Sequence, residues 1–248
     1  MRVSALIPTY NRRLQAFRAI DSVLAQTMPV DEVIVVDDGS TDGTYEAIRA
    51  HYGSSVIVVR QENRGVSAAR TRAVSEARGE WVAFLDSDDV WLPTKLERQS
   101  EALEAMGEGY GVCFTNCGFT GDPSIGTSAF EGVGLRTDVE FGPICNPLKY
   151  IVGQFGLYVQ SLLVLRTLVD EVGGFDEALG LSEDRDLTFR LSFRTKFCFV
   201  SEPLVTVDRS TACPRLTDLF ANKTDGTLSR FREFGQRDEW KDCSSASH

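Results

Sequence analysis

The first half of the chain alternates short apolar runs with segments whose apolar residues recur every three or four positions. Strands are predicted at the β-branched apolar runs, residues 3–7, 32–37, 56–60 and 81–86. Helices are predicted between them, at residues 12–26, 44–52 and 66–77. Three consecutive strand-helix-strand units build a sheet covered by helices. We therefore expect an α/β fold with a mostly parallel central sheet flanked by helices.

The second half is less regular. Helices are predicted at residues 94–106 and 184–193, and strands at residues 111–114, 157–165, 196–200 and 204–207. A Gly-rich stretch at residues 118–142 predicts a loop. We expect one domain at residues 1–212, with halves at 1–110 and 111–212. Residues 213–248 are expected to be a C-terminal extension of one or two amphipathic helices and a frayed tail.

Charge restricts the class of partner. The 26 Lys and Arg residues stand against 36 Asp and Glu, which gives a net charge of −10. Binding along DNA or RNA requires a basic surface, so we expect no nucleic-acid partner. An anionic ligand must then be held by local cations or by a metal ion.

The sequence also indicates a compartment. No apolar run approaches the roughly 20 residues that span a bilayer, and the N-terminus lacks a signal-peptide pattern, so we expect a cytoplasmic protein. The six cysteines contain no Cys-x-x-Cys pair, which favours reduced thiols. A zinc site at Cys113 and Cys117 is disfavoured because the chain has two histidines, His51 and His248.

Ligands of parallel α/β sheets bind beyond the carboxyl ends of the strands, which here are residues 8–11, 37–44 and 86–89. The strongest signal is the sequence FLDSDD, in which Asp86, Asp88 and Asp89 follow an apolar strand. Carboxylates this close repel one another unless a cation neutralises them, and Mg²⁺ or Mn²⁺ prefers oxygen ligands. The alternative is an acidic turn with Asp89 as the N-cap of the next helix.

A second acidic motif, VDDGSTDGT, follows the strand at residues 32–37. Asp37 and Asp38 are acceptor groups suited to the N–H and O–H donors of a base or ribose, and Asp38 is the stronger candidate. Ser40 to Asp42 are explained by turn and N-cap chemistry.

Two further motifs carry charged residues. In NRGVSAARTRAV, Arg70 and Arg72 could pair with a phosphate or lie on a solvated helix face. In SEDRDL, Ser182 is a candidate N-cap. The acids that follow it could either stabilise the helix N-terminus or supply a general base.

Taken together, six motifs resemble glycosyltransferase family 2, whose members are inverting enzymes of the GT-A fold. They are IPTYNR, VDDGSTDGT, NRGVSAAR, FLDSDDVWLPTKL, GGFDE and SEDRDL, and they occur in the family's order over residues 3–207. The resemblance implies that residues 1–110 bind a nucleotide sugar and residues 111–212 bind the acceptor.

The resemblance also implies roles for single residues. Substrate-binding residues would be Pro8, Thr9, Asp38, Arg70, Asp86 and Glu183. Asp88 would hold Mn²⁺ or Mg²⁺ with Asp86 beside it, and Asp184 would be the general base. The donor would be a nucleotide-diphosphate sugar, with UDP preferred on family frequency. The acceptor would be a hydroxyl of a glycan or a lipid-linked saccharide.

One departure from the family concerns the metal. Many relatives carry a His after the last core strand, whereas this chain reads VTVDRSTACP there, so Asp208 or Arg209 are candidate substitutes. The acceptor would place the enzyme at the inner membrane face, as a peripheral protein. The aromatic residues of the C-terminal extension could serve that contact, pack on the domain, or join two subunits.

Other functions fit the sequence less well. A nucleotidyltransferase would normally show a Gly-rich basic loop after the first strand, and a dehydrogenase would need Gly-x-Gly-x-x-Gly there. Neither pattern is present at that position. A binding module without catalysis would have no need for both Asp88 and Asp184.

Overall fold

The computed structural model describes residues 1–121, 127–152, 157–179 and 181–209. In the first half, the strands are β1 (Val3–Thr9), β2 (Glu32–Asp37), β3 (Ile57–Arg60) and β4 (Trp81–Phe84). The helices between them are α1 (Arg13–Leu24), α2 (Thr44–Tyr52) and α3 (Val66–Glu76), with a short 3-10 turn, η1 (Gly53–Ser55), after α2. These four strands pair in parallel, in the order β3-β2-β1-β4. The three predicted strand-helix-strand units are confirmed.

The second half extends the same sheet. Its strands are β5 (Val90–Trp91), β6 (Tyr110–Thr120), β7 (Phe141–Ile144), β8 (Leu162–Leu165) and β9 (Lys196–Asp208). Its helices are α4 (Lys95–Met106), α5 (Ala129–Gly132), α6 (Pro147–Val152), α7 (Arg166–Glu171) and α8 (Glu183–Leu191), with η3 (Val159–Ser161) before β8. The sheet continues from β4 as β8-β6-β9-β5, and β7 pairs with β9. Here β6 and β9 are parallel while β8, β5 and β7 run antiparallel to their neighbours.

Several boundaries differ from the prediction. The two strands expected at residues 196–200 and 204–207 are one strand, β9, whose pairing with β6 shifts register beside Pro203. Proline donates no backbone hydrogen bond, so it is tolerated where the ladder is irregular. The strand expected at 111–114 runs on to Thr120, and part of the expected loop at 118–142 forms α5 and β7.

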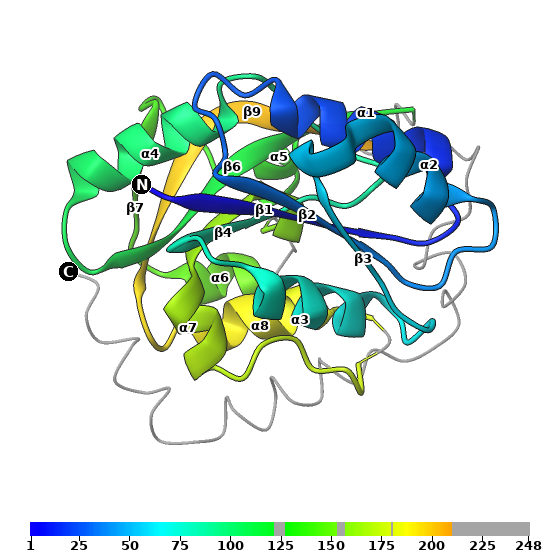
Figure 1. Cartoon of the computed structure of the whole chain (residues 1–248). Helices are drawn as coiled ribbons and strands as arrows, with labels where there is room; N and C mark the ends of the chain where they lie inside the picture. The colour runs from blue at the N-terminus through cyan, green and yellow to red at the C-terminus, as the bar shows by residue number, and fades with distance from the viewer. Residues whose placement is uncertain (122–126, 153–156, 180, 210–248) are drawn as a thin grey trace.

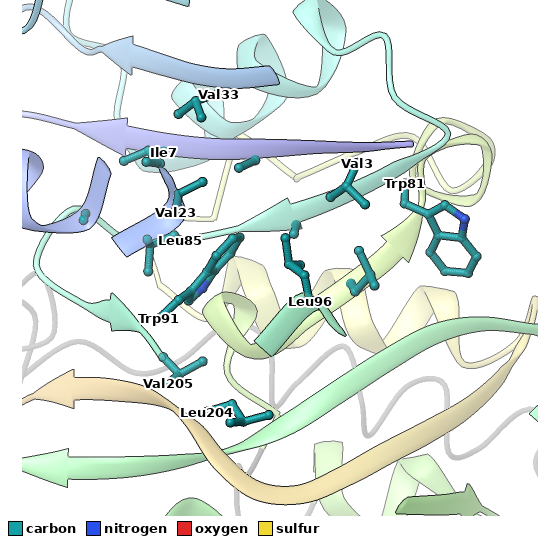
Figure 2. Close-up of a cluster of buried hydrophobic side chains, with 14 of the residues drawn as sticks. Val3, Ile7, Val23, Val33, Trp81, Leu85, Trp91, Leu96, Leu204 and Val205 are labelled. Carbon is teal, nitrogen blue, oxygen red and sulfur yellow. The ribbon is translucent and has the colours of Figure 1, made fainter. Parts of the chain in front are cut away.

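Two helical layers cover the sheet (Figure 1), with α1, α2 and α4 on one face and α3, α6, α7 and α8 on the other. Each layer encloses an apolar cluster. On the first face, Ile20 of α1 and Leu96 of α4 are fully buried with Trp91 of β5, as Figure 2 shows for part of this cluster. On the other face, Ala73 of α3 and Leu187 of α8 pack with Phe84. The carboxyl ends of β1, β2 and β4 therefore belong to a sheet that is packed against helices on both faces.

Within the described part of the chain, none of the helices has the length and apolar character needed to cross a membrane.

Four described cysteines are free, and three of them (Cys113, Cys117 and Cys198) are buried in the core. Burial raises the pKa of the Cys113 and Cys117 thiols, so these side chains serve as packing groups.

Candidate active site

The acidic turn after β4 has two partly exposed carboxylates, those of Asp86 and Asp88, and one buried carboxylate, that of Asp89. The backbone N–H of Asp89 donates to the carbonyl of Asp86 at 3.0 Å and closes the turn. The side chains of Asp86 and Asp88 are each 28% exposed, whereas Asp89 is buried. A ligand beyond the strand end can therefore reach Asp86 and Asp88.

Asp89 anchors this turn to the second half of the sheet. Its carboxylate accepts from the Nε2 of Gln160 at 2.6 Å and from the backbone N–H of Asp208 at 3.1 Å. Burial, together with the charges of Asp86 and Asp88, raises the pKa of Asp89. The alternative role of Asp89 as a helix N-cap is wrong, because α4 begins at Lys95, after β5, with Thr94 at the N-cap position.

Arg70 joins the acidic turn to the start of α8. Its guanidinium donates to Asp86 at 2.6 Å and to Glu183 at 2.5 Å, and it lies over the ring of Phe175 at 5.4 Å. The Arg70 side chain is 4% exposed. Burial alone would lower the pKa of Arg70, but the carboxylates of Asp86 and Glu183 outweigh it and raise the pKa above its usual value. Arg70 is thus a permanent cation between two acids.

Asp184 lies in the first turn of α8, directly after Glu183. Burial and the negative charge of Glu183 raise the pKa of Asp184 to about 7, although Arg70 opposes the shift. One carboxylate oxygen accepts the backbone N–H of Arg185 at 2.7 Å. A carboxylate with a pKa near neutrality can exchange a proton at physiological pH.

The start of α8 differs from a standard capped helix. Ser182 stands at the N-cap position, as expected, but its φ is 62° and its side chain makes no capping hydrogen bond. A non-glycine residue in this left-handed region costs free energy and often lies at a functional site. The only other such residue in the described chain is Asn11, which follows β1. Asn11 thus follows a strand end in the motif IPTYNR, and Ser182 precedes a helix start in the motif SEDRDL.

Two charged candidates from the sequence have structural partners instead. Asp186 pairs with Arg190 one helical turn later at 2.6 Å, and that arginine also donates to the carbonyls of Val172 and Gly174. Arg72 pairs with Glu76 at 2.6 Å, and its side chain is 51% exposed. Arg72 thus lies on a solvated helix face, the second of the two roles expected for it, and a contact with a phosphate stays a prediction.

Asp38 fastens the loop before α3. Its two carboxylate oxygens accept from the side chain of Gln61 at 2.8 Å and from the backbone N–H groups of Arg64 and Gly65 at 3.0 and 2.8 Å. Three of its acceptor positions are therefore occupied. A direct contact of Asp38 with a nucleoside stays a prediction, and its structural role in holding this loop has no signature in the sequence.

Thr9 and Asp37 offer free polar atoms beside it. They are register partners at the ends of β1 and β2. The Oγ1 of Thr9 and the Oδ1 of Asp37 are buried and lack a hydrogen-bond partner, as few buried polar atoms do. Pro8 precedes Thr9 in β1 and is the register partner of Val36. Both atoms are free to make a further hydrogen bond, and a contact of this region with the expected nucleoside stays a prediction.

Arg12 is a site residue that the sequence candidates did not include. Its Nη1 lies 3.1 Å from a carboxylate oxygen of Asp88, and the two side chains are 19% and 28% exposed. The signal was present in the motif IPTYNR, where Arg12 follows the end of β1. Both partly exposed carboxylates of the turn thus have an arginine partner: Arg70 for Asp86 and Arg12 for Asp88.

The donor set of the turn suits a hard divalent cation that arrives with a phosphate ligand. No group of three or more His, Cys, Asp or Glu side chains is placed to hold a metal among the described residues. Mg²⁺, however, is usually held by one or two carboxylates together with substrate phosphates and water. Asp86 and Asp88 meet that requirement in kind and number.

Comparison with known proteins identifies the family. Residues 4–150 match the family described as Glycosyl transferase family 2. An uncharacterised glycosyltransferase of Rickettsia prowazekii is 30% identical over 209 residues, which are 82% of this chain and 62% of that protein. The UDP-Glc:alpha-D-GlcNAc-diphosphoundecaprenol beta-1,3-glucosyltransferase WfaP of Escherichia coli is 37% identical over 103 residues, 41% of each chain. The chain thus spans at most about three fifths of these relatives.

Solved structures share the fold. The TarS fragment 1–349 of S. aureus in complex with UDP-GlcNAc superposes with a TM-score of 0.73 at 20% identity, covering 96% of this chain and 68% of that chain. The mannosyltransferase PcManGT of Pyrobaculum calidifontis, in complex with GDP-Man and Mn²⁺, gives a TM-score of 0.61 at 21% identity, covering 85% and 58%.

Proposed function

The chain belongs to glycosyl transferase family 2 and has the GT-A fold, and from this premise we propose that it transfers a sugar from a nucleotide-diphosphate donor to a hydroxyl acceptor with inversion. One observation carries the proposal. A single guanidinium, that of Arg70, contacts both the partly exposed acidic turn at Asp86 and the residue preceding Asp184. This contact supports placing the proposed donor-binding acids and the proposed general base at the same end of the sheet, as a transfer reaction requires.

Asp184 is the proposed general base. Its pKa is raised to about 7, so near neutral pH it can be ionised and still accept a proton from the acceptor hydroxyl. The hydroxyl oxygen then attacks the anomeric carbon as the bond from that carbon to the diphosphate breaks. A single displacement of this kind inverts the configuration at the anomeric carbon.

The donor is proposed to bind at the ends of β1, β2 and β4. Thr9 and Asp37 supply buried polar atoms for the nucleoside, with Pro8 and Asp38 beside them. Asp88, with Asp86, would hold Mn²⁺ or Mg²⁺, which neutralises charge on the departing diphosphate. UDP is the proposed nucleotide, because WfaP is named for a UDP-glucose donor and TarS was solved with UDP-GlcNAc.

The acceptor is proposed to be a hydroxyl of a glycan or a lipid-linked saccharide. Support comes from the name of WfaP, which specifies a diphosphoundecaprenol-linked acceptor. Such an acceptor would draw a cytoplasmic enzyme to the inner membrane face. The expected C-terminal extension at residues 213–248, with its contact to a membrane or a second subunit, lies outside the described residues.

A donor screen tests the proposal. Thermal shifts with UDP, GDP, dTDP and CDP sugars, each with and without Mn²⁺, should identify one stabilising donor. Release of the free nucleotide from that donor should then follow, first with water and then with saccharide acceptors. A protein that binds a donor without ever releasing nucleotide would be a binding module, and one that binds none of these donors would not be a sugar-nucleotide transferase.

A further inference from the structure

Arg70 contacts both the acidic turn after β4 and the start of α8 through ion pairs. Asp86 follows β4, and Glu183 begins α8, far away in the sequence. The side chains of Arg70 and Glu183 are 4% and 10% exposed, so water and salt screen their interaction weakly. This guanidinium therefore links the start of α8 directly to the turn.

The guanidinium itself is held in place from several sides. The ring of Phe175 lies under it at 5.4 Å, and that ring packs edge-on against Phe84 of β4 at 5.3 Å between centroids. The start of α3, which carries Arg70, is fastened by the contact between Asp38 and the backbone of Gly65. An arginine anchored in this way acts as a rigid spacer.

The helix it holds begins without a side-chain capping hydrogen bond. Ser182, at the N-cap position, has a positive φ, and the first turn carries acids rather than a cap. Glu183 in that turn is instead bound by Arg70, and Asp184 is the next residue. A shift of this turn would move Asp184 with it.

We propose that Arg70 is a positioning residue that sets the base Asp184 against the acidic turn by holding Asp86 and Glu183 together. This inference rests on the proposed function. It differs from a role as a direct donor ligand, in which the remaining N–H groups of the guanidinium would contact the phosphates while Asp86 and Glu183 stay bound to its two terminal nitrogens.

Arg70→Lys separates the two roles, since lysine keeps the charge but lacks the planar fork that reaches two carboxylates. The probes are UDP for affinity, by calorimetry with Mn²⁺, and UDP release from UDP-glucose and UDP-GlcNAc for turnover. We expect UDP affinity close to that of the wild type and turnover lower by about 10²-fold, the effect of misplacing a reacting group by about 1 Å.

Arg190→Lys is the matched control. Arg190 also pairs with an acid of α8, Asp186, at 2.6 Å, and it also holds the chain before the helix, but it contacts neither Asp86 nor Glu183. Its replacement should lower the melting temperature and keep turnover close to that of the wild type. Equal losses of turnover in the two variants would overturn the proposal in favour of a general loss of stability.

Three further outcomes are decisive. A fall in UDP affinity that matches the fall in turnover of Arg70→Lys would make Arg70 a donor ligand. If Arg70→Lys does not fold, Glu183→Ala removes only the helix side of the link and should lower turnover with UDP affinity retained; unchanged turnover would refute the inference. A wild-type protein that releases UDP from neither sugar would instead refute the proposed UDP-sugar transfer itself.

Discussion

Arg12 and Asp88 form an ion pair at 3.1 Å across the ends of β1 and β4. Asp88 is the residue expected to hold the metal, so the described structure shows it neutralised by an arginine. In an acidic chain with a net charge of −10, such a pair keeps adjacent carboxylates from repelling one another. A cation that binds Asp88 must compete with Arg12.

This competition predicts that Arg12→Ala strengthens the binding of Mn²⁺ to the protein without nucleotide. An ion pair with this exposure is worth about 0.2–1 kcal/mol, so the affinity for Mn²⁺ should rise by a factor of about 1.4 to 5. Titration of Mn²⁺ into each protein in a calorimeter measures this affinity. Arg72→Ala is the control, because Arg72 pairs with Glu76 on the surface and should leave Mn²⁺ binding unchanged. A weaker affinity in Arg12→Ala would show that Arg12 assists the metal.

Asp88→Ala is expected to abolish the effect of Mn²⁺ on UDP binding, because it removes a carboxylate that can bridge the metal to the diphosphate. The companion variant is Asp89→Asn. Asp89 is buried against Gln160 and the backbone of Asp208, so its loss of charge should leave Mn²⁺-stimulated binding in place. Calorimetry with Mn²⁺ and with EDTA compares the variants. Equal UDP affinity of the wild type in both conditions would remove the metal from the proposal.

The part of the fold that the sequence predicts is the part built from local patterns. Strands β1 to β4 and helices α1 to α3 follow from apolar periodicity within single segments. The two-residue strand β5 could not be predicted, because it exists only through its pairing with β9. Likewise Pro203 and the polar residues before it suggested a break in β9 that the pairing with β6 overrides.

The candidate site likewise has parts that local sequence predicts and parts that only the fold brings together. Asp86, Asp88 and Asp184 stand out through charge density at a strand end and a helix start, and the family resemblance adds Arg70 and Glu183. The ion pair between Arg70 and Glu183 could not be predicted, since these two residues meet only through the fold. Asp38 shows the limit most clearly: its motif suggested a ligand contact, whereas its carboxylate fastens the loop at Arg64 and Gly65.

A pH profile is expected to report Asp184. Turnover requires its ionised form, and because its pKa is raised to about 7, UDP release should increase as the pH rises through that value and then level off. Glu183→Gln removes the neighbouring negative charge, lowers the pKa of Asp184 and moves the rise to lower pH. Asp186→Asn is the control, because Arg190 neutralises Asp186 and the rise should stay in place. A profile unaffected by Glu183→Gln would point to another titrating group.

Asp184→Asn tests the base directly. The amide keeps the size of the side chain and an oxygen for the backbone N–H of Arg185, but it cannot take a proton. Turnover should fall by about 10² to 10⁴, the usual contribution of a general base. UDP affinity should stay near that of the wild type, because the proposed donor contacts lie on the loops after β1, β2 and β4.

The same variant should be more stable than the wild type at alkaline pH. The pKa of Asp184 is higher in the folded protein than its ordinary value of 3.8, so the folded state holds a proton that the unfolded chain has lost. Stability from this group therefore declines as the pH rises from about 4 to about 7, and above that range the charge on Asp184 is a cost that asparagine removes.

We expect the free energy of unfolding of Asp184→Asn to exceed that of the wild type by on the order of 1 kcal/mol at alkaline pH. Near pH 4, where Asp184 is largely protonated in the folded protein, the two values should match. Denaturant titrations at both pH values measure the difference. A variant that loses stability at alkaline pH, or that keeps its turnover on a verified acceptor, would make Asp184 a structural part of the helix start rather than the base.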